Sequence, residues 1–189
     1  MINSIYGLVL SGGESSRMGS DKGLITSENK TWSQIAFEKL SVHCSKVFVS
    51  INPLQYEKYK TYFPENIILD SVSIKGPLCG LLSFYEKFPH KDVIILACDM
   101  LKITDKTLHL LYENYLKNPE KDFIIFKNDN QLEPLCGIYT SKGLKNVYEN
   151  YQNNSLQNFS IKRILDPINT LFLNHSNHSE LKNYNYPDY

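Results

Sequence analysis

The sequence predicts an α/β protein in which a mostly parallel, twisted sheet is covered by helices on both faces. Three observations lead to this prediction. Short apolar runs alternate with segments of helical periodicity through residues 1–117, which is the pattern of βαβ units. The run at 93–97 is apolar at every position, as expected of a central parallel strand that is buried on both faces. The length of 189 residues suits a single domain.

The strands are expected where apolar residues form short runs that end at turn-forming or polar residues. The run at 5–10 stops at Gly12 and Gly13, and the run at 67–69 ends at Asp70. The predicted strands are 5–10, 46–51, 67–69, 93–97, 123–126, 135–139 and 170–173. Because the chain turns polar after the last of them, we expect one domain over residues 1–182 and a C-terminal tail over 183–189.

The helices are expected where apolar residues recur every three or four positions. Thr31 and Gln34 have the spacing of a capping box at the start of the first helix. Leu108 and Leu111 fall on one face of the fourth helix. The predicted helices are 31–44, 53–62, 76–88, 104–116, 143–151 and 156–165.

Charge and composition exclude several classes of protein. Lysine plus arginine total 20 and aspartate plus glutamate total 20, so the chain has no bulk positive charge for nucleic acid. No apolar run approaches the ~18 residues of a membrane span, and no basic segment typical of an export signal precedes the first strand. The four cysteines include no CxxC pair, which disfavours a structural zinc site. We therefore expect a cytoplasmic protein that binds neither nucleic acid nor membranes.

A polar, glycine-rich segment follows the first predicted strand and reads LSGGESSRMGSDK over residues 10–22. Glycines leave backbone amides open to a phosphate group, and Ser15 and Ser16 add hydroxyl donors. Arg17 and Lys22 add two cations, and a guanidinium can bind two phosphate oxygens at once. The segment lacks the GxxxxGK[ST] and GxGxxG motifs, so a plain linker is an equal alternative on glycine content alone.

Polar residues also follow the other predicted parallel strands, whose carboxyl ends meet at one edge of the sheet. Asn52 could bind a base or a sugar, or it could form the turn before Pro53. Asp70 could accept a hydrogen bond from a ribose or a base, or it could cap a loop. Asp99 suits a Mg²⁺ ligand, because it is a carboxylate at the carboxyl end of a buried strand. It could instead cap the helix that follows, but Thr104 is better placed to do so.

The five histidines are scattered, and only His175 and His178 lie close together in the sequence. A metal-binding pair is one interpretation of their spacing. A surface loop is favoured, because the surrounding residues are polar. No spacing of serine, histidine, aspartate or cysteine indicates a catalytic nucleophile.

Five motifs occur in order along nearly the whole chain, from about residue 5 to residue 181. They are LVLSGGESSRMGSDKGLI (8–25), GPLCG (76–80) shortly after Asp70, ILACDM (95–100), EPLCGIY (133–139) and FLNHSNHSEL (172–181). The first resembles the signature of the molybdenum cofactor guanylyltransferases, broadly LAGGxSxRMGxDK. Its GxSxRMGxxK part is shared with the wider nucleotidyltransferase superfamily, so the Gly12-Gly13 pair and the later motifs carry the resemblance to this particular family.

The resemblance implies a Rossmann-like nucleotidyltransferase fold and the transfer of GMP from GTP to the terminal phosphate of molybdopterin, with Mg²⁺ as cofactor. GTP and the molybdenum cofactor would be its partners, with molybdoenzyme-specific chaperones as a further expectation. It also implies that Arg17, Lys22 and Asp99 are catalytic, that Asp99 holds the metal, and that 133–135 lie nearer the pterin. The nucleotide-binding residues that it implies are Leu10, Ser11, Gly12, Gly13, Ser15, Lys22, Asn52, Asp70 and Asp99.

Three positions depart from the pattern of this family. Ser11 stands where alanine is usual, a mild change in a loop that is read mostly by its backbone. Leu101 stands where proline is usual, which loosens the loop after Asp99, and Ser176 replaces a second asparagine in the last motif. Two alternatives stay open: a transferase that uses CTP or a sugar-phosphate acceptor, and a non-catalytic relative that binds GTP.

Overall fold

The computed structural model describes residues 5–12, 21–128, 131–165, 169–177 and 179–184. Its main sheet has seven strands in the order β5-β4-β1-β6-β8-β7-β9. They are β1 (Tyr6–Leu10), β4 (Lys46–Ile51), β5 (Ile67–Leu69), β6 (Val93–Ala97), β7 (Phe123–Asn128), β8 (Gln131–Tyr139) and β9 (Thr170–Asn174). A separate hairpin pairs β2 (Thr26–Ser27) with β3 (Lys30–Thr31).

The sheet is mostly parallel, as the alternating sequence pattern predicts. β1 pairs in parallel with both β4 and β6, β4 with β5, and β7 with β9. Among the described strands of this sheet, β8 runs antiparallel to both of its neighbours. The beginning of β8 therefore lies at the same edge as the carboxyl ends of the parallel strands.

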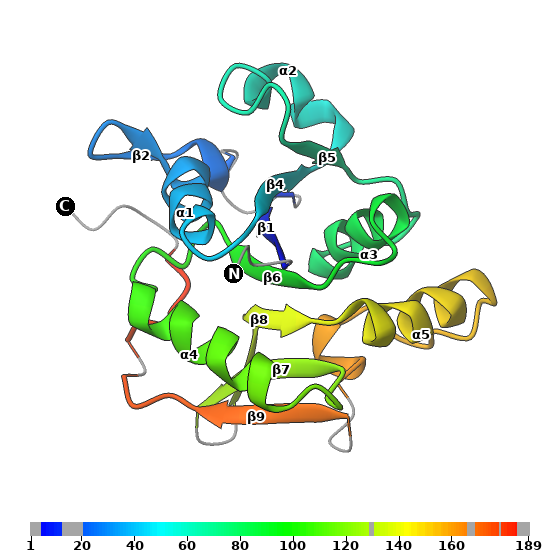
Figure 1. Ribbon diagram of the computed structural model, residues 1–189. Helices are drawn as coiled ribbons and strands as arrows, with labels where there is room; N and C mark the ends of the chain where they lie inside the picture. The colour runs from blue at the N-terminus through cyan, green and yellow to red at the C-terminus, as the bar shows by residue number, and fades with distance from the viewer. Residues whose placement is uncertain (1–4, 13–20, 129–130, 166–168, 178, 185–189) are drawn as a thin grey trace.

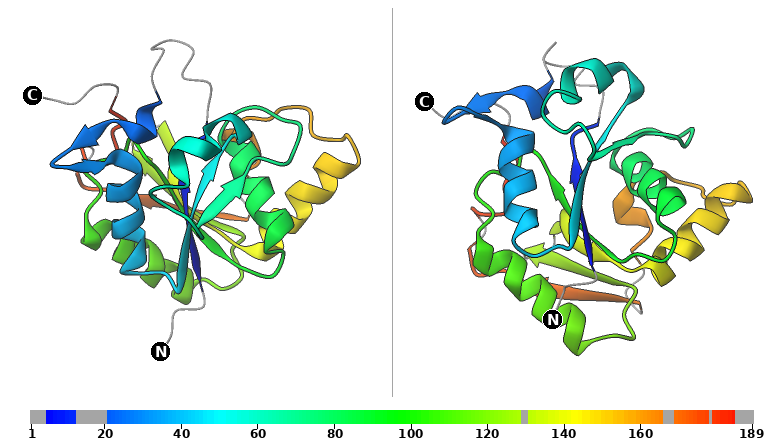
Figure 2. Two further views of the ribbon diagram at one scale, coloured as in Figure 1. Left: turned by 90° about the horizontal axis from the view of Figure 1, so that it is seen from above. Right: turned by 45° about the horizontal axis from the view of Figure 1, so that its top comes forward.

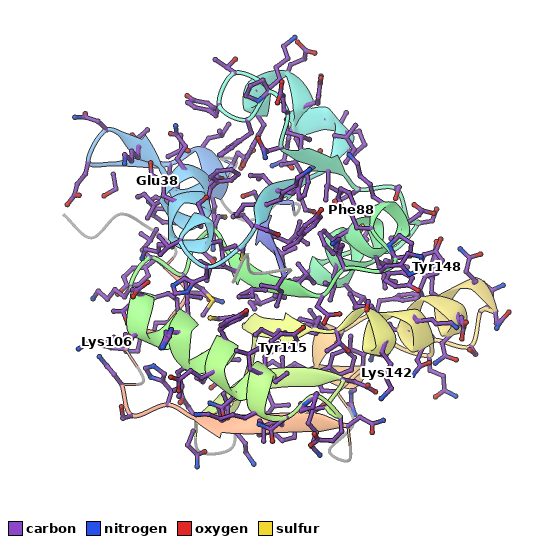
Figure 3. The ribbon with its side chains drawn as sticks, in the orientation of Figure 1. Glu38, Phe88, Lys106, Tyr115, Lys142 and Tyr148 are labelled. Atoms are coloured by element: carbon purple, nitrogen blue, oxygen red, sulfur yellow. The ribbon has the colours of Figure 1, made fainter. Side chains whose placement is uncertain are left out.

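Helices cover both faces of the sheet, and the α/β fold class is confirmed (Figure 1). α1 (Trp32–Ser41) and α4 (Asp105–Lys117) cover one face, and α3 (Pro77–Lys87) and α5 (Ser141–Gln152) cover the other. Figure 3 labels Tyr115 on α4 and Tyr148 on α5, on these two sides of the sheet. The smaller helices are η1 (Lys22–Leu24), η2 (Pro53–Gln55), α2 (Tyr56–Tyr59) and η3 (Ile161–Arg163).

Side chains alternate between two apolar cores because successive strand residues point to opposite faces. In β6, Ile94 and Leu96 pack under α1 and α4, whereas Val93 and Ile95 pack under α3 and α5. All four are fully buried, which explains why the run is apolar at every position.

Capping residues set the starts of two helices as the sequence predicts. Thr31 caps α1, with its side chain accepting from the Gln34 amide and Gln34 reaching back to the Thr31 amide. Thr104 caps α4 by accepting from the Thr107 amide. Asp99 is therefore not needed as the cap of α4, and its carboxylate remains available for another role.

The predicted helix over 156–165 is wrong, because the structure has only the single turn η3 in that range. The Asn158 side chain accepts a hydrogen bond from the Ser160 amide at 2.8 Å. This local bond offers the backbone an alternative to the helical ladder. The β2–β3 hairpin was not predicted, since its two-residue strands are too short to leave an apolar pattern.

Within the described residues, no helix combines the length and apolar character that crossing a bilayer requires. The four cysteine thiols are free. Three of them are buried and pack as small apolar side chains, namely Cys79, Cys98 and Cys136.

Candidate functional site

Residues from the ends of β1 and β6 and from the middle of β8 line a cavity of about 170 Å³ at the carboxyl edge of the sheet. The left view of Figure 2 shows the strands rising to this edge, where η1 and α2 lie. The lining residues are Leu10, Ser11, Gly12, Lys22, Pro77, Ala97, Cys98, Asp99 and Leu135. Two cavities of about 460 Å³ lie elsewhere, beside β5 and beside α5, but neither includes a residue from the ends of β1 or β6.

Backbone hydrogen bonds continue the sheet past the ends of its strands. The Ser11 amide donates to the Ser50 carbonyl at 3.0 Å, and the Cys98 amide donates to the Leu10 carbonyl at 3.2 Å. The Asp70 amide likewise donates to the Ile51 carbonyl at 2.9 Å. The residues that follow β1, β5 and β6 are thus held by backbone hydrogen bonds at one edge of the sheet.

An ion pair between Lys22 and Asp99 stands at this cavity. The Lys22 Nζ lies 3.1 Å from the Asp99 Oδ2, and the two side chains are 25% and 14% exposed. Tyr184 closes the same corner, since its amide donates to the Asp99 carbonyl at 2.8 Å and its own carbonyl accepts from Lys22 at 3.4 Å. The pair is sheltered but still within reach of an anionic ligand.

Asp21 fixes the backbone next to Lys22. Its carboxylate accepts hydrogen bonds from the Gly23 amide at 3.1 Å, the Tyr59 hydroxyl at 2.9 Å and the Gln55 amide group at 2.6 Å. Burial, with Asp21 nearby, raises the pKa of Tyr59 well above its ordinary value, so the phenol stays a donor. Gln55 also donates to the Ser11 carbonyl at 3.3 Å, and it therefore ties both ends of the glycine-rich segment together.

The side chains of two serines, Ser11 and Ser33, pack against Gly23 next to Asp21. The Ser11 and Ser33 hydroxyls lie 2.9 Å apart, and the Ser33 Oγ donates to the Gly23 carbonyl at 2.7 Å. A Cβ at position 23 would lie 2.2 Å from the Tyr59 hydroxyl and 2.5 Å from the Ser33 hydroxyl. Only glycine fits there without displacing the groups that hold Asp21 and Ser11.

Asp70 lies beside Gly12, at the start of the glycine-rich segment. Its Oδ1 accepts a hydrogen bond from the Ser50 hydroxyl at 3.0 Å, and a Cβ on Gly12 would lie 3.0 Å from its Oδ2. Burial raises the pKa of the Asp70 carboxyl above its ordinary value, against the opposing effect of hydrogen bonds from Ser50 and Cys79. A half-buried carboxylate next to Gly12, which lines the cavity, is suited to accept hydrogen bonds from a ligand.

Asn52 forms the turn before Pro53, which is one of the two roles that the sequence suggests for it. Its Oδ1 accepts from the Leu54 amide at 2.9 Å, and its own amide donates to Gln55 at 2.9 Å. It caps η2 and thereby sets the position from which Gln55 reaches Asp21. Gly13, Ser15 and Arg17 lie outside the described residues.

The surface-loop interpretation of His175 is wrong. The residue is 8% exposed, and its ring lies against Phe126 and 2.9 Å from the Thr107 hydroxyl. Thr107 also donates to Glu180, so the last motif is tied to the start of α4. The contacts of His175 to a threonine hydroxyl and to backbone atoms of Asn177 explain its position without a metal, and His178 lies outside the described residues.

The site contains one carboxylate that is suited to a metal bound together with phosphates. In the part of the chain that the structure describes, no three histidine, cysteine or acidic residues gather as a ready-made metal cage. Mg²⁺ on a nucleotide needs only one or two protein carboxylates, because phosphate oxygens and water fill its remaining positions. Asp99, beside an ammonium at a cavity mouth, fits that requirement.

Ser33, Gln55 and Tyr59 belong to this arrangement but were not identified from the sequence. Their side chains contact Asp21 or Ser11 across 22 to 44 positions of sequence. Asp21 stands inside the first motif, and that was the one signal pointing to it.

A mostly parallel sheet whose carboxyl edge brings Gly12, an ammonium and a carboxylate together is typical of the class of α/β nucleotide-binding proteins. The chain belongs to the family of MobA-like NTP transferase domains, whose sequence profile matches residues 7–168. It is therefore a nucleotidyltransferase, and the resemblance noted in the sequence is confirmed at the level of the family.

Named relatives agree with this assignment. The chain is 29% identical to a molybdenum cofactor guanylyltransferase of Campylobacter jejuni subsp. doylei, over 98% of this chain and 93% of that protein. It is 32% identical to a molybdenum cofactor biosynthesis bifunctional protein of Synechocystis, over 75% of this chain but only 40% of that longer protein. The crystal structure of molybdopterin-guanine dinucleotide biosynthesis protein A from Archaeoglobus fulgidus shares the fold, with a TM-score of 0.73 and 21% identity over 90% of this chain and 83% of that one.

Proposed function

We propose that this protein transfers GMP from GTP to the terminal phosphate of molybdopterin and releases pyrophosphate, in a reaction that depends on Mg²⁺. The names of its full-length relatives in Campylobacter support the choice of substrates. The observation that carries the proposal is the Lys22–Asp99 pair, which stands at the mouth of a cavity lined by Ser11 and Gly12.

The chemistry requires charge neutralisation more than proton transfer. The acceptor is a phosphate monoester, whose second pKa is about 6, so it is already mostly a dianion at neutral pH. One of its oxygens attacks the α-phosphorus of GTP, a new P–O bond forms, and the bond to pyrophosphate breaks. No general base is needed, so catalysis consists of positioning the two anions and screening their repulsion.

Each element of the site has a role in that scheme. Asp99 would hold the metal, which when bound neutralises phosphate charge. The Lys22 ammonium, freed from part of its contact with Asp99, would bind phosphate oxygens, together with Arg17 and the amides of Gly12 and Gly13. Further nucleotide contacts are proposed for Leu10, Ser11, Ser15, Asn52 and Asp70, of which Asn52 and Asp70 would hold the guanosine.

The acceptor is proposed to bind beside the first half of β8, at residues 133–135. Leu135 lines the cavity, and Glu133 precedes it on the same strand. Burial raises the pKa of the Glu133 carboxyl, with Lys162 opposing that effect. A half-buried carboxylate at this edge could accept hydrogen bonds from a nitrogen-rich ring such as a pterin.

A thermal-shift screen tests the nucleotide assignment. GTP, ATP and CTP are each added with and without Mg²⁺, because a ligand that binds only the folded protein raises its melting temperature. We expect the largest rise with GTP and Mg²⁺, followed by pyrophosphate release when molybdopterin is added. A larger rise with CTP would favour a transferase of another acceptor, and GTP binding without pyrophosphate release would favour a non-catalytic role.

A further inference from the structure

A lysine ammonium is half-buried between α1 and the loop that follows Asp99. Lys39 stands in the last turn of α1 and is flanked by buried residues of the core, including Leu40. Burial lowers the pKa of Lys39 from its ordinary value, while nearby Cys136 and Glu180 oppose that shift. Placing an ammonium here is costly unless it is well hydrogen-bonded.

The hydrogen bonds that Lys39 makes go to the backbone just beyond Asp99. Its Nζ donates to the Leu101 carbonyl and, at 2.8 Å, to the Ile103 carbonyl. Residues 98–104 belong to no helix or strand, so the carbonyls of Leu101 and Ile103 lie outside the regular ladders. One side chain therefore anchors the loop to α1 at two points.

Other contacts hold the same loop at its beginning. The Met100 amide donates to the Ala97 carbonyl at 3.1 Å, and the Tyr184 amide donates to the Asp99 carbonyl at 2.8 Å. After Met100, the Ile103 amide donates a longer hydrogen bond to the Met100 carbonyl, at 3.4 Å, and the Lys102 ammonium lies over the Tyr184 ring, 5.2 Å from its centroid. The two Lys39 hydrogen bonds are thus the contacts that tie this part of the loop to α1. The direction of the Asp99 side chain depends on this backbone.

We infer that Lys39 is a positioning residue, which holds the loop at 101–103 so that Asp99 faces the phosphates and their metal. The inference rests on the proposed role of Asp99. Lys39 itself lines no part of the cavity at the carboxyl edge, so it acts through the backbone and not by touching the nucleotide. Leu101 lacks the ring with which a proline would stiffen this loop, and the Lys39 hydrogen bonds supply that restraint.

The test compares GTP affinity with Mg²⁺ and with a chelator, by calorimetry, in variants that remain folded. Lys39→Met keeps the length of the side chain but removes its donors, Lys39→Arg keeps charge and donors, and Lys30→Met is the control at an exposed lysine. We expect Lys39→Met to reduce the gain in affinity that Mg²⁺ brings by about tenfold, or about 1.4 kcal/mol. Metal-free affinity should not change, and Lys39→Arg should recover most of the gain.

Two results would overturn the inference. Lys39→Met could match Lys30→Met in both titrations, or it could lose affinity equally with and without metal, which would indicate a structural role alone. If Lys39→Met melts too low for titration, Lys39→Gln is titrated in its place under the same criteria. Asp99→Ala separates the two proposals: if it keeps the full Mg²⁺-dependent gain, the metal role of Asp99 fails, whatever Lys39 does.

Discussion

The Lys22 ammonium and the Asp99 carboxylate lie 3.1 Å apart, although 77 positions separate them in the sequence. β1 and β6 are adjacent and parallel, so the segments that follow them emerge at the same edge. The ion pair adds a side-chain contact to the backbone pairing that already joins the first motif to the motif that ends β6. Because each side chain shields the other, a triphosphate with its metal could replace their mutual contact without leaving either charge alone.

Removing the ammonium of Lys22 should slow the reaction more than it weakens folding. We predict that Lys22→Ala lowers kcat/KM for GTP. The loss of transition-state stabilisation should be about 2–4 kcal/mol, as when one donor of an oxyanion hole is removed. Steady-state pyrophosphate release measures the effect, and Lys30→Ala, at a lysine that is half exposed, is the matched control. Equal kcat/KM in the two variants would remove Lys22 from the catalytic group.

Gly23 is predicted to be intolerant of any side chain, because a methyl group would displace the hydroxyls of Tyr59 and Ser33. Gly23→Ala should reduce the free energy of unfolding by about 1–3 kcal/mol, the usual cost of overpacking. Urea denaturation measures it. The same substitution in a Tyr59→Phe background should cost less, since the nearest clashing oxygen is gone; an unchanged cost would mean that the clash is not the cause.

The ionised carboxylate of Asp70 is predicted to lower the free energy of unfolding, although it is proposed to bind the nucleotide. Its pKa is raised in the folded protein, so the folded state holds a proton more tightly than the unfolded chain does. Stability should therefore fall as the pH rises through the window between the ordinary carboxyl pKa, about 4, and the raised value. Asp70→Asn should melt higher than the wild type at pH 7, and the two should converge below that window.

The same variant should bind GTP more weakly, by about tenfold, if one hydrogen bond to a charged group of roughly 1.5 kcal/mol is lost. Melting curves between pH 3 and pH 7 and a GTP titration provide the two measurements. Ser41→Ala, at an exposed serine on α1, is a control that should move neither. A lower melting temperature of Asp70→Asn at neutral pH would show that the burial cost is not the controlling effect.

The fold was largely predictable because burial leaves a direct trace in the sequence. The strands at 46–51, 67–69 and 93–97 have the predicted ends, since each is a short apolar run that stops where the chain meets solvent. β8 begins earlier than predicted, at Gln131, because its first residues are less buried and break the apolar pattern. Hydrogen bonds such as that of Asn158, which replace a helix by a turn, are invisible to periodicity.

The site was predictable only where it follows the ends of strands. Lys22, Asp70 and Asp99 come to one edge because parallel strands must end together. The hydrogen bonds to the Asp21 carboxylate could not be predicted, because Gln55 and Tyr59 donate them from a different βα unit. Such contacts depend on how side chains cross between elements, for which a single sequence carries no periodic signal.

The most direct test of the central claim is pyrophosphate release from GTP by Asp99→Ala, measured with molybdopterin and Mg²⁺ beside the wild type. We predict that the variant keeps the wild-type melting temperature within a few degrees and releases pyrophosphate at least about 100-fold more slowly, or about 2.7 kcal/mol in activation free energy. Glu57→Gln, which changes an exposed carboxylate, should release it at the wild-type rate. Full activity in a folded Asp99→Ala protein would contradict the account.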